Sequence, residues 1–157
     1  MLELLDRVIG AVVPSVVKSI VNRSRLKIVC GWGHEGNGDG VGNFLALRVK
    51  IINPTTSSVY FERLEAIDQS GEVFFPTLYY VKSGDEIHPQ RNIVGAVPCG
   101  HATCKNRPKS LHIYDSTERK YVVNRRMLRK ALEELDAEGA RLERLNISVH
   151  PTHPQPK

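Results

Sequence analysis

The sequence predicts a mainly β protein, in which about seven antiparallel strands form a sandwich with one helix before them and one after them. The clearest observation is residues 45–51, where large aliphatic side chains alternate with alanine, arginine and lysine. This period of two places alternate side chains on opposite faces of a strand, one against a core and the other in water. Other short apolar runs follow, and turn residues rather than helices separate them, which favours antiparallel sheets.

Length and composition are those of one globular domain. A chain of 157 residues can bury a self-sufficient core without disulfides or metal. The formal net charge of +5 favours an anionic partner, such as nucleic acid, anionic lipid or an acidic protein surface. Three cysteines are an odd number and favour a reducing compartment over a secreted disulfide scaffold. Neither a signal-peptide pattern nor a membrane-spanning apolar run is present, so we expect a cytoplasmic protein.

Residues 1–24 are predicted to form an N-terminal amphipathic helix. Their polar and helix-breaking residues recur at steps of three and four, which leaves a wide apolar arc on the remaining face. This arc can pack on the β domain or on a copy of itself, lie on a membrane surface, or enter a groove of a partner protein. Basic residues just after the helix favour membrane association, whereas the scarcity of cations and aromatic anchors within it does not. The arc includes Leu5, Ile9, Val12, Val16 and Ile20.

Residues 25–123 are predicted to form the sandwich. Residues 31–42 are rich in glycine but lack the Gly-Lys-Ser/Thr ending of a phosphate-binding loop, so we interpret them as a hairpin connection. Asn53 and Pro54 should end the most regular strand, and Pro89 should weaken a later one. The strand candidates cover residues 25–32, 45–51, 58–67, 72–75, 78–82 and 87–97, and a final hairpin joins 110–115 to 119–123.

Residues 124–149 are predicted to form a C-terminal helical segment, followed by a tail at 150–157. Asn124 is a suitable N-cap and Gly139 a suitable stop. An apolar stripe should dock the helix on the sandwich, and residues 142–149 should add a short turn or strand. Cations occupy the first half of the helix and acids the second, opposite to the preference of the helix dipole, which points to a partner. The stripe consists of Met127, Leu128, Ala131, Leu132 and Leu135.

A basic segment lies between residues 105 and 130, and it is the candidate surface for binding an acidic protein or nucleic acid. Tyr114 and Tyr121 in the same segment can stack on bases, or they can be core or cross-strand residues. The alternative is an ordinary solvated basic surface. The candidate binding residues are Arg107, Lys109, Arg119, Arg125, Arg126, Arg129 and Lys130.

Cysteine and histidine residues provide a candidate zinc site, because thiolate and imidazole are ligands that zinc prefers. Their spacing matches no standard zinc motif, so buried or idle cysteines, or a Cys99–Cys104 disulfide, are alternatives. The candidate ligands are Cys30, His34, Cys99, His101 and Cys104. A thiol nucleophile with His101 or His112 as its base can be drawn, but no catalytic motif surrounds it. We therefore expect no enzyme and no cofactor other than this zinc.

The order of these parts resembles a known group of proteins. The sequences RLKI, LRVKIINPTTSSVYFERLEAIDQSGEVFF and LHIYDSTERKYVV, with a Ser-Gly turn between the last two, are similar to small, uncharacterised immunoglobulin-like sandwich proteins of bacteria and their phages. The resemblance covers roughly residues 25–123 and implies an immunoglobulin-like fold without transferring any site residue. The resulting hypothesis is a non-enzymatic protein-binding module, such as a phage or mobile-element protein that acts on a host complex. The alternatives are a membrane-peripheral protein anchored by the N-terminal helix and a nucleic-acid-binding protein that uses residues 105–130.

Overall fold

The computed structural model describes residues 26–36, 43–99 and 107–147, and within them the protein is mainly β. The predicted N-terminal helix and the C-terminal tail lie outside these residues. Every strand pairing is antiparallel, as the sequence predicts. The elements are β1 (Lys27–Gly36), β2 (Asn43–Ile52), β3 (Val59–Ile67), β4 (Val73–Phe74), β5 (Glu86–Ile87), β6 (Asn92–Pro98), β7 (Ser110–Asp115), β8 (Lys120–Val122) and α2 (Arg125–Arg144).

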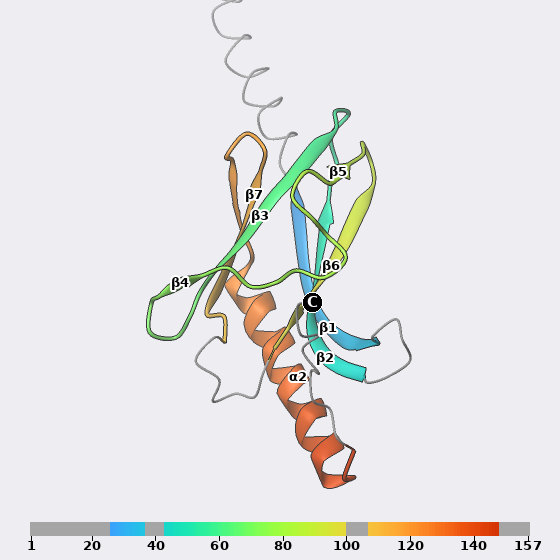
Figure 1. Ribbon diagram of the computed structural model, residues 1–157, viewed down its shortest axis with the longest axis vertical. Coiled ribbons are helices and arrows are strands. Elements are labelled where there is room, and N and C mark those ends of the chain that lie inside the picture. The colour runs from blue at the N-terminus through green and yellow to red at the C-terminus, as the bar shows by residue number, and fades with distance from the viewer. Residues whose placement is uncertain (1–25, 37–42, 100–106, 148–157) are drawn as a thin grey trace, which may run out of the picture.

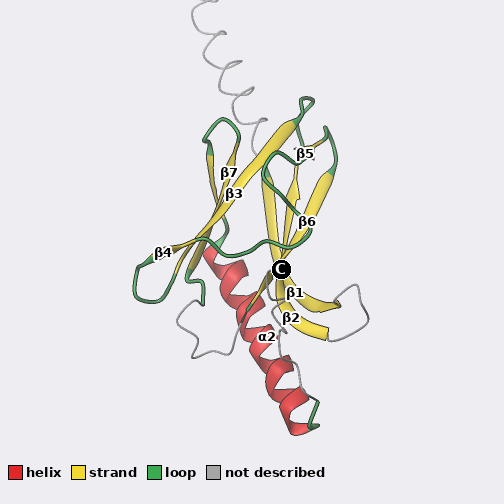
Figure 2. Ribbon diagram, viewed as in Figure 1, coloured by secondary structure: helices red, strands yellow, loops and turns green. Residues whose placement is uncertain are grey.

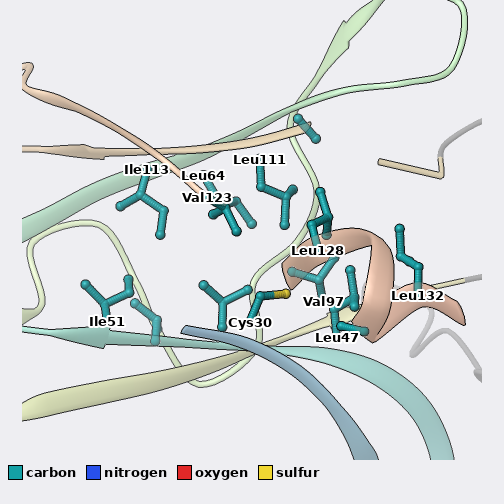
Figure 3. Close-up of a cluster of buried hydrophobic side chains, with 14 of the residues drawn as sticks. Cys30, Leu47, Ile51, Leu64, Val97, Leu111, Ile113, Val123, Leu128 and Leu132 are labelled. Atoms are coloured by element: carbon teal, nitrogen blue, oxygen red, sulfur yellow. The ribbon is translucent and has the colours of Figure 1, made fainter. Parts of the chain in front are cut away.

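The strands form two sheets that enclose one core (Figures 1 and 2). The three-stranded sheet has the order β1-β2-β6. The five-stranded sheet has the order β4-β3-β7-β8, and β5 pairs with β3 as well. Figure 3 shows side chains of the two sheets pointing toward one another, with Leu128 of α2 beside them. The helix therefore completes a core that neither sheet could cover alone.

Strand β2 confirms the alternation on its inner face and departs from it on its outer face. Leu47, Val49 and Ile51 are fully buried, whereas Arg48 is exposed. The prediction that Ala46 faces water is wrong, because Ala46 is buried with Phe44, Ala96 and Tyr79 in a second apolar cluster. The outer face of the sheet is thus covered at one end.

The segment that covers it was predicted to be a strand over residues 78–82, and this prediction is wrong. Only Tyr79 pairs there, in a single bridge to Ala96 at the edge of β6. The next residue, Tyr80, has φ of 70°, which ends the extended conformation at once. The side chain of Leu78 lies directly over Gly95 of β6. This crossover segment is therefore attached to the sheet by one bridge, by the contact of Leu78 with Gly95 and by the packing of Tyr79 against Phe44.

The boundaries of β5, β6 and β1 also differ from those predicted. The predicted strand at 87–97 divides into β5 and β6, because Gln90 has φ of 59° in the turn between them. Asn53 holds this turn from within: it is fully buried, and its Nδ2 donates to the carbonyls of Ser57 and Ile87 at 2.7 Å. The glycine-rich connection is shorter than predicted, because β1 continues to Gly36.

Two hairpin turns share one design. In the β3–β4 turn, Oδ1 of Asp68 accepts hydrogen bonds from the Ser70 hydroxyl and from two backbone amides, and Gly71 has φ of 92°. In the β7–β8 turn, Oδ1 of Asp115 accepts the equivalent bonds from Thr117 and Arg119. Such aspartate-capped turns are specified locally, which explains why the sequence predicts both hairpins.

Helix α2 begins where predicted and ends later. The Asn124 side chain accepts hydrogen bonds from two backbone amides, and most of the predicted stripe is buried. The stop at Gly139 is wrong: the helix continues to Arg144, because Leu142 is buried and adds to the stripe. The turn predicted from residue 142 begins only at Leu145, and residues 148–149 of the predicted segment lie outside the described part. Arg141 and Arg144 occupy the last turn, so the helix ends with charges that the dipole favours.

Candidate binding surface at the start of helix α2

The exposed cations at the start of α2 form the main candidate site. Arg125, Arg126, Arg129 and Lys130 are all exposed, and the first turn contains no acidic residue. Lys109 is exposed as well and precedes β7 at the end of the hairpin from which α2 begins. We call these five residues the basic surface. The four helical cations lie on one side of α2, whose opposite side is buried.

Acidic residues compensate this charge only weakly. Arg129 lies 3.7 Å from Glu133 and Lys130 lies 3.8 Å from Glu134, one helical turn later. The two cationic side chains are 75% and 78% exposed. Exposed pairs of this kind contribute about 0–1 kcal/mol, so they release a cation easily to a better partner.

Arg107 belongs to the packing of α2 and not to its exposed face. It is buried, and its Nη2 donates to the Leu132 carbonyl at 3.2 Å and to the Asp136 carboxylate. A guanidinium can satisfy several acceptors at once, which allows it to be buried in such a place. Of the seven predicted binding cations, this one connects the β7 side of the protein to the middle of α2.

Arg119 lies at the opposite end of the β7–β8 hairpin from the basic surface. The extended chain from Arg119 to Val123 spans roughly 13 Å. The cations of residues 105–130 are close in sequence but not all close in space, because the tip of the β7–β8 hairpin lies away from its two ends. The basic segment is therefore divided between the hairpin tip and the helix start.

The two tyrosines that could stack on bases are both engaged within the protein. Tyr121 is buried and its hydroxyl donates to Oδ2 of Asp115 at 2.8 Å. Tyr114 is half-buried, and the guanidinium of Arg63 lies 4.0 Å from the centre of its ring. They are respectively a core residue and a cross-strand residue, which was the alternative that the sequence left open.

The second half of α2 is attached to β1 by its acidic residues. The indole of Trp32 donates to Glu134 at 3.1 Å, and Nε2 of His34 lies 3.1 Å from Glu138. Hydrogen bonds from Arg141 and His34 lower the pKa of Glu138 to about 2. In this half of the helix, contacts within the protein therefore account for the charge order that opposes the helix dipole.

The structure describes three of the five candidate zinc ligands, Cys30, His34 and Cys99. Cys30 is buried in the core, and this burial raises the pKa of its thiol to about 12. His34 is turned toward Glu138, and Cys99 is half-buried. His101 and Cys104 lie outside the described residues. No three His, Cys, Asp or Glu residues of the described part gather as a metal site would require.

His112, the other candidate base, is buried on β7. Its Nδ1 lies 3.2 Å from Oε1 of Glu65 on the neighbouring strand, and the Tyr114 hydroxyl lies 3.4 Å from the same oxygen. These contacts place it in a cross-strand polar cluster. The register of β3 and β7 creates this pair, which the sequence alone did not reveal.

Comparisons with protein families, curated proteins and solved structures found no match to this chain. Within the described residues, no helix has both the length and the apolar character needed to cross a membrane. The residues of the predicted apolar arc, from Leu5 to Ile20, are outside the described part. The basic surface is therefore the best-defined candidate binding site in the described part of the chain.

Proposed function

We propose that this protein is a non-enzymatic binding module, an immunoglobulin-like domain whose basic surface binds an acidic surface of a partner protein. The observation behind the proposal is the set of four exposed cations in the first turns of α2, against the preference of the helix dipole. An isolated helix gains nothing from this arrangement. A partner with complementary charge supplies a reason for it, through faster association and a fixed orientation.

The attachment of α2 supports a binding role. Its apolar stripe, the Arg107 contacts and the bonds to Trp32 and His34 hold the helix against both sheets. A rigid helix presents its cations in one geometry and loses little conformational entropy on binding. The proposed partner is a protein of the host in which a phage or mobile element would act.

An acidic protein fits this surface better than single-stranded nucleic acid does. Proteins that bind single strands usually combine a basic groove with aromatic side chains on which bases stack. Here Tyr114 and Tyr121 already have partners within the fold. The basic surface therefore offers charge without a stacking platform.

The test is affinity capture from an extract of the native host with the full chain as bait. The variant Arg125→Gln/Arg126→Gln/Arg129→Gln removes three charges from the basic surface. A matched control, Lys27→Gln/Lys50→Gln/Arg91→Gln, removes three exposed charges elsewhere. We expect the wild type and the control to capture the same acidic protein after nuclease treatment, and the surface variant to lose it.

Two results would contradict the proposal. Equal capture by all three baits would show that the basic surface is not the binding site. Loss of the captured material on nuclease treatment would identify nucleic acid as the ligand.

A further inference from the structure

The free edge of strand β8 lies beside the basic surface. β8 pairs only with β7, and it is the last strand in the order of its sheet. The backbone amide of Val123 donates to the Leu111 carbonyl, and that of Asp115 donates to the Arg119 carbonyl. Because hydrogen-bonded residues alternate along an antiparallel pair, the N–H and C=O groups of Lys120 and Val122 point away from β7. Among the described residues, no group pairs with them.

The other sheet edges are bonded in part or adjoin acidic residues. At the edge of β1, the Cys30 amide donates to Sδ of Met127 on α2. At the edge of β6, Tyr79 forms its bridge to Ala96. The edge of β4 is next to the acidic Glu72, and the short edge strand β5 contains the acidic Glu86. Within the described part of the chain, β8 is the open edge with basic neighbours.

The residues around this edge define what fits it. Lys120 is exposed at its start, and Arg125 and Arg126 are exposed just after its end. Val122 is 58% exposed between them and offers an apolar contact. An added strand would therefore meet cations at both ends and an aliphatic side chain in the middle. Acidic residues flanking an apolar one complement this pattern.

We propose that β8 accepts an extended acidic segment of a partner protein as an added antiparallel or parallel strand. This inference rests on the proposed function and names the form of its partner. Backbone hydrogen bonds to Lys120 and Val122 hold the segment, and the basic surface selects its charge. A second copy of β8 is a poor occupant, because pairing two such edges would bring like charges together. The short, lysine-bearing edge thus avoids self-association and remains open to an acidic strand.

The experiment uses the full chain and two probe peptides of the same charge. One peptide alternates glutamate and valine, and the other has the same sequence with methylated backbone nitrogens, so it cannot donate to a strand edge. Affinity is measured by fluorescence anisotropy, and amide hydrogen exchange is followed residue by residue by NMR. The amide of Tyr121 is the internal reference, because the register directs it toward Ile113 of β7.

We expect the unmodified peptide to bind at least about tenfold more tightly than the methylated one, a difference of about 1.4 kcal/mol. Exchange at Lys120 and Val122 should slow when it binds, whereas exchange at Tyr121 should change little. The triple Gln variant of Arg125, Arg126 and Arg129 should bind both peptides more weakly, and the control variant should not.

The failures of the two proposals are distinguishable. Equal affinity for both peptides, with unchanged exchange at Lys120 and Val122 but sensitivity to the triple variant, would overturn strand addition and leave the basic surface as the site. If neither peptide binds, or if the triple and control variants behave alike, both proposals are wrong.

Discussion

The contact between Gly95 and Leu78 allows a sharp test of how the crossover segment is held. A Cβ atom added at Gly95 would lie 2.4 Å from Cδ1 and 2.5 Å from Cγ of Leu78. Cγ is not the flexible end of the side chain, so Leu78 must move as a whole. Gly95 is not among the glycines with positive φ, so the substitution adds crowding without backbone strain. We expect Gly95→Ala to reduce the free energy of unfolding by about 1–3 kcal/mol, the usual effect of overpacking.

A double-mutant cycle isolates this contact. Leu78 is partly buried, so Leu78→Ala alone should cost about 2 kcal/mol, near the lower end for a leucine truncation. In the double variant the new methyl group occupies space that Leu78 has left, so the combined loss should be about 1–2 kcal/mol smaller than the sum. Urea unfolding followed by the fluorescence of Trp32, the single tryptophan, measures all four proteins.

Gly31→Ala provides the control for this cycle, because a Cβ at Gly31 meets nothing within 4 Å. Its effect should stay within about 0.5 kcal/mol. If Gly95→Ala is as stable as the wild type, or if the losses at the two positions are additive, the close contact does not exist.

Three further predictions test helix packing and turn chemistry. Gly139→Ala should stabilise the protein by about 1 kcal/mol in urea unfolding, since the new methyl would lie 3.6 Å from Leu45; destabilisation would mean that the helix ends at this residue. Arg107→Gln should cost about 1–3 kcal/mol through lost buried hydrogen bonds, and a neutral effect would place this side chain in water. Burial alone would raise the pKa of the Asp115 carboxyl, but the hydrogen bonds that it accepts lower this pKa overall. The ionised carboxylate therefore stabilises the folded state fully above the unfolded pKa of about 3.9, and this stabilisation is lost as pH falls toward the folded pKa. Unfolding at a series of pH values should therefore show a decline below about pH 4 that Asp115→Asn reduces, and identical profiles would refute this.

Structural features that depend on residues close together in the sequence can be predicted from the sequence. The alternation in β2 and the Asn124 cap are determined by residues within one strand or one helical turn. The hairpin turns at Asp68 and Asp115 likewise use side chains that bond to their own backbone. These local rules predicted the mainly β class, the antiparallel sheets and the C-terminal helix.

The sequence showed an excess of cations in one segment, but not which of them lie on the same surface. Along the sequence, Arg107 and Arg119 belong to the same basic segment as the cations at the start of α2. Folding buries Arg107 against α2 and moves Arg119 to the far end of a hairpin. Only strand register and helix docking decide which charges of one segment share a face.

The sequence by itself determined the sheet-forming pattern, the start of α2 and the excess of positive charge, because each depends on residue type and short spacing. Tertiary structure alone decided that α2 extends past Gly139, that Tyr79 bridges to the edge of β6 and that, within the described residues, β8 pairs on one side only. These features arise from contacts between residues distant in the chain. Their energies depend on which surfaces meet, and no local pattern contains that information.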